Sequence, residues 1–159
     1  MFTKLTAVAC LLAASILTAV AVAAASPAGS KQRIVITNLK GNPNRFVLAA
    51  LAPGPVARDS GTASACCWIQ RFITREGQSI EIDSPVLRTF VGKQGTFTWR
   101  ASIEWVGAGN GYTVGTGTWT IVRGTGVYQH LEGSGHVALL DTGDASLSSR
   151  AEGLVDLHR

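Results

Sequence analysis

The chain has 159 residues, of which 46% are hydrophobic, and a formal net charge of +4 at pH 7. Its basic residues form no run and do not alternate with aromatic residues, a pattern that favours a solvated, slightly cationic surface over nucleic-acid binding. We therefore expect no nucleic-acid partner. The scattered basic positions include Lys40, Arg45, Arg58, Arg71, Arg75, Arg88, Lys93, Arg100, Arg123 and Arg150.

The N-terminal segment has the pattern of a secretory signal peptide. Lys4 precedes residues 5–25, which carry no charge, are mostly Ala, Val, Leu and Ile, and end in three alanines. A basic start, an apolar centre and small residues at the exit are typical of such a peptide. Residues 1–25 are therefore predicted to form a signal helix that is cleaved after Ala25, followed by a linker over 26–30. The alternative is a retained membrane anchor, because roughly 20 apolar residues can span a bilayer.

This pattern predicts a secreted or periplasmic protein that is not stably inserted in a membrane after cleavage. Residues 31–159 are then predicted to form one all-β domain, because period-two hydrophobic patterns dominate them. Residues 53–62 have the composition of a loop. The expected strands span residues 31–38, 45–52, 65–75, 79–83, 96–106, 112–123, 136–141 and 145–157.

The clearest alternation lies in residues 96–106. Its odd positions are apolar and its even positions are mostly polar, so one face is predicted to meet the core. The apolar positions are Phe97, Trp99, Ala101, Ile103 and Trp105. Strands of this number and spacing predict a single antiparallel eight-stranded barrel, which leaves no unpaired edge. Its interior would be just wide enough for side chains or one small ligand.

Two adjacent cysteines, Cys66 and Cys67, fall within the predicted strand 65–75. Neighbouring residues of a strand point to opposite faces, so the two thiols are not expected to meet. We expect one buried thiol and one on the opposite face. A redox pair or a metal site is disfavoured, because neither cysteine has a Cys-x-x-Cys partner or a histidine at ligand spacing.

Residues 119–135 carry the most specific motif, W-T-I-V-R-G-T-G-V-Y-Q-H-L-E-G-S-G. A strand runs into a Gly124-Thr125-Gly126 turn, and an aromatic residue and a second glycine pair, read as another turn, follow. This motif resembles the signature of the allene oxide cyclase–dirigent superfamily, and most of all its small exported bacterial members. The resemblance implies a calycin-like eight-stranded barrel. It also implies that any reaction would be a cofactor-independent isomerisation or cyclisation in the lumen.

Catalytic and metal-binding motifs are not recognisable, so the catalytic residues stay unknown. Ser134 lies in a predicted turn, which disfavours a nucleophilic role. His130, His136 and His158 show no metal-ligand spacing. We expect neither a metal nor another cofactor.

Aromatic residues are the remaining candidates for a site. If they share the interior of a barrel, they either fill it as packed core or form the wall of an apolar ligand pocket. The residues predicted to bind a ligand are Trp68, Phe97, Trp99, Trp105 and Trp119. The leading hypothesis is thus a barrel that binds a small apolar molecule or acts as a non-catalytic module. The alternatives are a cofactor-independent isomerase or cyclase, and a protein–protein interaction or inhibitor module.

Overall fold

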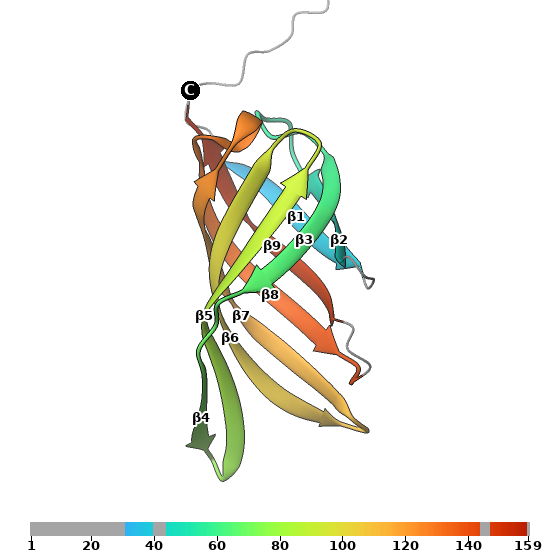
Figure 1. Ribbon diagram of the computed structural model, residues 1–159, viewed down its shortest axis with the longest axis vertical. Coiled ribbons are helices and arrows are strands. Elements are labelled where there is room, and N and C mark those ends of the chain that lie inside the picture. The colour runs from blue at the N-terminus through green and yellow to red at the C-terminus, as the bar shows by residue number, and fades with distance from the viewer. Residues whose placement is uncertain (1–30, 40–43, 144–146, 159) are drawn as a thin grey trace, which may run out of the picture.

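The computed structural model describes residues 31–39, 44–143 and 147–158, which form an all-β structure (Figure 1). The helical structure of these residues is one turn of 3-10 helix, η1 (Gly126–Tyr128), and none of their helices could cross a bilayer. The predicted signal helix (1–25) and linker (26–30) lie outside the described residues. The strands are β1 (Gln32–Leu39), β2 (Asn44–Ala50), β3 (Asp59–Cys66), β4 (Gln70–Arg75), β5 (Gln78–Gly92), β6 (Thr96–Gly109), β7 (Tyr112–Gly124), β8 (Leu131–Asp141) and β9 (Leu147–Leu157).

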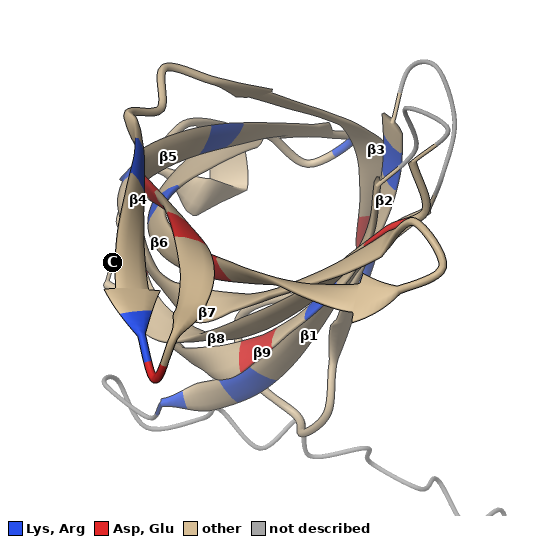
Figure 2. Cartoon of the chain, turned by 90° about the horizontal axis from the view of Figure 1, so that it is seen from below, with Lys and Arg blue, Asp and Glu red and all other residues tan. Residues whose placement is uncertain are grey.

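These strands form one antiparallel sheet in the order β3-β2-β1-β9-β8-β7-β6-β5-β4. A further antiparallel pairing of β3 with β5 closes the sheet into a ring, seen from below in Figure 2. Among the described strands β4 pairs with β5 alone and extends the sheet beyond the ring. The predicted all-β class is confirmed, with nine strands in place of eight.

β5 is long because it changes partners along its length. Its residues 87–92 pair with β3, and its residues 78–83 pair with β4. Between these segments the register with β6 shifts by one residue, from Asp83 opposite Ile103 to Val86 opposite Ala101. Such a shift reverses the face that each side chain takes. Asp83 and Arg88 therefore both lie on the interior face, although strict alternation would separate them.

The interior is packed with aromatic rings. The alternation predicted for 96–106 is confirmed, because Phe97, Trp99, Ala101 and Ile103 are exposed by 5% or less. Phe97 stacks on Phe90 with 4.6 Å between ring centroids, and Trp99 stacks on Trp119 at 5.4 Å. Offset stacking of this kind stabilises aromatic pairs beyond the area they bury. This part of the ring is therefore filled by its own side chains.

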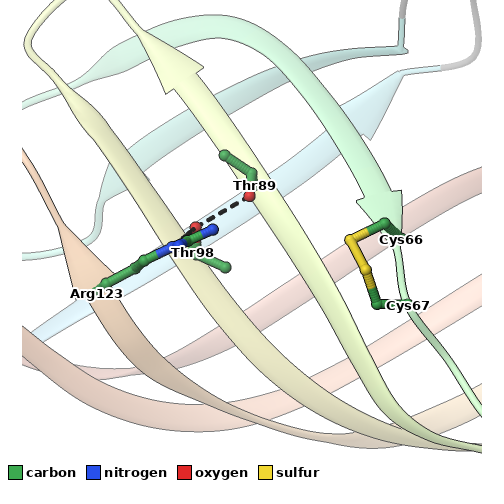
Figure 3. Close-up of a disulfide and its surroundings, with 5 residues drawn as sticks. All are labelled: Cys66, Cys67, Thr89, Thr98 and Arg123. Carbon is green, nitrogen blue, oxygen red and sulfur yellow. Dashed lines mark hydrogen bonds between the residues drawn. A yellow bond between two sulfur atoms is a disulfide. The ribbon is translucent and has the colours of Figure 1, made fainter.

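One polar residue of β6 departs from the alternation. Thr98 lies on the outer face yet is only 1% exposed. Arg123 covers it, and its Nε donates to the Thr98 hydroxyl at 3.2 Å. The hydroxyls of Thr89 and Thr98 lie 3.0 Å apart, so the three side chains link β5, β6 and β7 (Figure 3).

η1 lies at the upper end of the ring in Figure 1. Tyr128 inserts into the core with 1% exposure, and its hydroxyl donates to Asp59 Oδ2 at 2.9 Å. Asp59 also accepts hydrogen bonds from the backbone amides of Ser60, Lys93 and Gln94. Burial raises the pKa of the Asp59 carboxyl, but these hydrogen bonds together outweigh it and keep that pKa below its ordinary value. One carboxylate thus joins β3, the β5–β6 turn and η1.

The second glycine pair, Gly133 and Gly135, lies inside β8, so its assignment to a turn is wrong. The reason is the packing of Trp119. A Cβ atom on Gly135 would lie 2.7 Å from the Trp119 ring, and one on Gly153 of β9 would lie 2.5 Å from it. These glycines leave room for the indole, whose Nε1 donates to the carbonyl of His136 at 3.1 Å. Glycine in a strand here marks close packing.

The single strand predicted over 65–75 is also wrong. β3 ends at Cys66 and β4 begins at Gln70, because Cys67 adopts a left-handed conformation with φ of 60°. The two cysteines form a disulfide, and both are exposed (Figure 3). The expectation of one buried thiol fails, because face alternation applies only where the chain stays extended. The predicted loop over 53–62 is likewise shorter, since β3 begins at Asp59.

Candidate functional site at the lower rim of the ring

A row of interior residues crosses the sheet at the lower end of the ring. Each member lies directly opposite the next on the neighbouring strand, and directly opposite residues share a face. The row runs from Asn38 through Ser149, Leu139 and Gly115 to Trp105. We call this row, with Asp83 and Arg88 of β5, the lower rim. Trp105 is only partly buried although it packs against the core, so solvent reaches the interior face here.

Small residues make room for the large ones along this row. A Cβ atom on Gly115 would lie 2.7 Å from the Trp105 ring, so glycine at that position lets the indole lie flat over β7. At the other end, Asn38 Nδ2 donates to the Ser149 hydroxyl at 2.6 Å. Asn38 Oδ1 is buried without a hydrogen-bond partner. The row is therefore mainly apolar, with one unused acceptor.

Asp83 places a carboxyl group beside Trp105. The Trp105 Nε1–H donates to Asp83 Oδ2 at 3.0 Å, while Oδ1 is buried without a partner. Burial raises the pKa of Asp83 above its ordinary value, opposed by the Trp105 hydrogen bond and assisted by the charge of Glu81. A carboxyl group with a raised pKa holds its proton more strongly than an exposed one, which suits a role in proton transfer.

Arg88 places a positive charge on the interior face. It is only 4% exposed and lies opposite Trp99 of β6 and Ala65 of β3. Its guanidinium carbon is 6.0 Å from the centroid of the Phe90 ring, within reach of a cation–π contact. Burial lowers the pKa of Arg88 to about 10, so the side chain is still charged at neutral pH. Arg88 is thus not one of the solvated surface cations that the sequence led us to expect.

The five aromatic residues predicted to bind a ligand do not all share one place. Phe97, Trp99 and Trp119 come together in the packed interior, and Trp105 lies at the lower rim. Trp68 lies apart from them, between β3 and β4, and is 52% exposed. Its neighbours Ile69 and Phe72 are exposed as well. The sequence placed Trp68 on a core face because the break at Cys67 was not foreseen.

Sequence reasoning missed Arg88 and Asp83. The alternation of Val86, Arg88 and Phe90 offered a signal for Arg88, because two apolar residues flank it on one face of a strand. No comparable sequence pattern indicated an interior position for Asp83. Its position depends on the register shift beside Pro85, which reverses the faces of β5. Among the described residues, no group of three or more His, Cys, Asp or Glu side chains is placed to bind a metal ion.

A broad hollow of about 1380 Å³ lies on the outer face of β6 to β9. Some of its charged side chains pair with one another. Arg33 and Arg150 both contact Glu152, at 3.2 and 2.8 Å, and His158 lies 3.5 Å from Glu132. Exposed pairs of this type contribute little energy. The lower rim, which has a buried cation and two unpartnered oxygens, is the stronger candidate site.

The fold and the rim define a small all-β protein whose sheet closes into a ring around an apolar interior that contains ionisable groups. Comparison of the chain with protein-family models, with curated proteins and with solved structures finds no match.

Proposed function

We propose that the eight strands of the ring, which leave out β4, form an exported barrel of the type seen in the allene oxide cyclase–dirigent superfamily, and that this barrel binds a small and largely apolar molecule in its lumen. The observation that carries the proposal is the contrast between the two ends of the ring. Tyr128 is buried at the upper end, whereas the partly buried Trp105 keeps part of the interior face accessible at the lower rim. A ligand would enter there and lie against Trp105 and Leu139.

Such a ligand would gain affinity mainly from burial of its apolar surface. Removing about 300 Å² from water at about 25 cal/mol per Å² contributes roughly 7.5 kcal/mol before the cost of association. Association costs about 4 kcal/mol or more, so burial alone leaves about 3.5 kcal/mol at most, which corresponds to a Kd of a few millimolar. The few polar groups at the rim would set the orientation of the ligand, as they do in apolar pockets generally.

The experiment is a titration of the secreted form with apolar probes and with sugars and nucleotides as negative controls. Fatty acids, terpenoids or phenolics are expected to shift or quench tryptophan emission, and sugars and nucleotides are not. Calorimetry then compares Trp105→Leu with Trp68→Leu, the same change at an exposed position. Trp105→Leu should weaken binding several-fold, and Trp68→Leu should leave it unchanged. If no apolar probe binds, the interior is packed solid and the interaction-module hypothesis replaces this one.

Asp83 favours a second candidate function, a cofactor-independent isomerase or cyclase. Its raised pKa and its unpartnered buried Oδ1 suit a group that transfers a proton to or from a bound substrate. The test is incubation with an unsaturated epoxide, followed by separation of products of unchanged mass. Asp83→Asn should abolish conversion and keep binding. Conversion at the same rate in Asp83→Asn would refute this role.

A further inference from the structure

Arg88 is a buried cation that the protein itself does not neutralise. It takes part in none of the ion pairs among the described residues. Its Nε is buried without a hydrogen-bond partner. A charge that has lost most of its hydration inside a protein is unfavourable when no counter-charge compensates for it. Arg88 therefore lacks a counter-charge, which a bound anion would supply.

The missing group can approach from the lower rim. The two terminal nitrogens of Arg88 donate no hydrogen bond to described residues, yet they are not among the buried atoms that lack a partner. They therefore retain contact with solvent at the edge of the interior. Arg88 lies where β5 leaves β3 and turns to β4, so the ring is interrupted directly below it.

The residues around Arg88 indicate what kind of ligand would fit beside it. Trp99 lies opposite it on β6, Phe90 lies under its guanidinium, and Ala65 of β3 adds a small apolar side chain. The single positive charge of Arg88 suits a ligand that carries a single negative charge. A planar guanidinium pairs with a planar carboxylate through two parallel hydrogen bonds, and the neighbouring rings favour an apolar or aromatic body.

We propose that Arg88 is the anion-binding group of the lumen and that the ligands of this protein are small apolar monocarboxylates. This inference rests on the proposed function, because it requires a ligand in the ring. The carboxylate pairs with the Arg88 guanidinium, and the apolar body extends along the rim toward Trp105. Neutral molecules of the same shape bind by burial alone and bind more weakly.

The first test needs no variant. Calorimetry on the secreted form compares 2-naphthoate with 2-naphthamide, which has the same ring system and no charge, and with 2-naphthyl phosphate. We expect the carboxylate to bind about tenfold or more tightly than the amide, as charge-assisted hydrogen bonds provide. The doubly charged phosphate should bind more weakly than the carboxylate, because its second negative charge would be buried without a partner, and tighter binding of the phosphate would overturn the assignment to monocarboxylates. Equal binding of acid and amide overturns the inference while the proposed function stands, and no binding of either overturns both.

The second test assigns the preference to Arg88. Arg88→Met keeps an unbranched apolar stem and removes the charged guanidinium. It should remove the preference for naphthoate while naphthamide still binds. Arg100→Met is the matched control, because Arg100 is exposed on β6, and it should keep the wild-type preference. A preference that survives in Arg88→Met shows that the anion binds elsewhere and overturns the assignment. If Arg88→Met does not fold, Arg88→Lys, which keeps the charge and loses the second parallel hydrogen bond, should bind naphthoate several-fold more weakly, and unchanged binding overturns the paired geometry.

Discussion

Removal of one hydroxyl group tests whether the Asp59–Tyr128 contact closes the upper end of the ring. Tyr128→Phe keeps the ring that packs against Phe97 at 5.1 Å and deletes the donor that lies 2.9 Å from Asp59 Oδ2. The volume of the core is almost unchanged. Any loss of stability then reports on the hydrogen bond to the carboxylate.

The expected loss is at the lower end for a hydrogen bond to a charged group. Such bonds contribute about 1.5–3 kcal/mol, and Asp59 keeps three backbone donors, from Ser60, Lys93 and Gln94, at 2.7–3.2 Å. We therefore expect Tyr128→Phe to reduce the free energy of unfolding by about 1.5 kcal/mol, which corresponds to a fall in Tm of roughly 5 °C. Tyr112→Phe is the control, because Tyr112 is 46% exposed, and it should stay within about 0.5 kcal/mol of wild type.

The pH dependence of this loss identifies its cause. The pKa of Asp59 in the folded state lies below its ordinary value of 3.8, so its stabilisation is complete above pH 3.8 and is lost as the pH falls below it. Tyr128→Phe removes one of the hydrogen bonds that lower this pKa. The difference between variant and wild type, measured by urea unfolding, should therefore be full at pH 7 and shrink below pH 3.8. A difference that is the same at pH 3 and pH 7 would refute the charged hydrogen bond and indicate lost packing.

Three further predictions concern the turn, the disulfide and export. Gly126 has φ of 61°, and an added Cβ would lie 2.6 Å from the carbonyl oxygen of Gln94. Gly126→Val should therefore cost about 1–3 kcal/mol in chemical unfolding, with exposed Ser148→Val near neutral, and equal losses would remove this explanation. Reductant should change the Tm little, because the Cys66–Cys67 disulfide closes the shortest loop and constrains the unfolded chain least. N-terminal sequencing of exported protein should begin just after Ala25, whereas a membrane-bound product that keeps residues 1–25 would restore the anchor hypothesis.

The sequence predicted correctly those features that depend only on residues close together in the chain. The alternation around Trp99 gave the correct interior face, and the gap between the expected strands 65–75 and 79–83 holds a turn at Glu76 and Gly77, which both have positive φ. The turn predicted at Gly124-Thr125-Gly126 follows the end of β7, and Gly126 has positive φ. Such features follow from side-chain period and backbone sterics, which act within a few residues.

The candidate site was mostly beyond prediction because it depends on contacts between distant segments. The inward position of Asp83 results from a shift against β6, and β5 changes partner only because β3 ends at Cys66. Gly133 and Gly135 of β8 were assigned to a turn because Trp119, the residue that requires glycine at position 135, lies on another strand. A single sequence does not reveal which of its distant residues are in contact in the folded chain.

The pairing of β1 with β9 has a consequence for the time at which the ring can form. Asn38 and Ser149, which are hydrogen-bonded in this pair, are 111 residues apart in the chain. A nascent chain therefore carries two unpaired strand edges, on β1 and β8, until β9 has been synthesised. Pairings over such separations form slowly, so closure of the ring between β1 and β9 is expected to be a late step of folding.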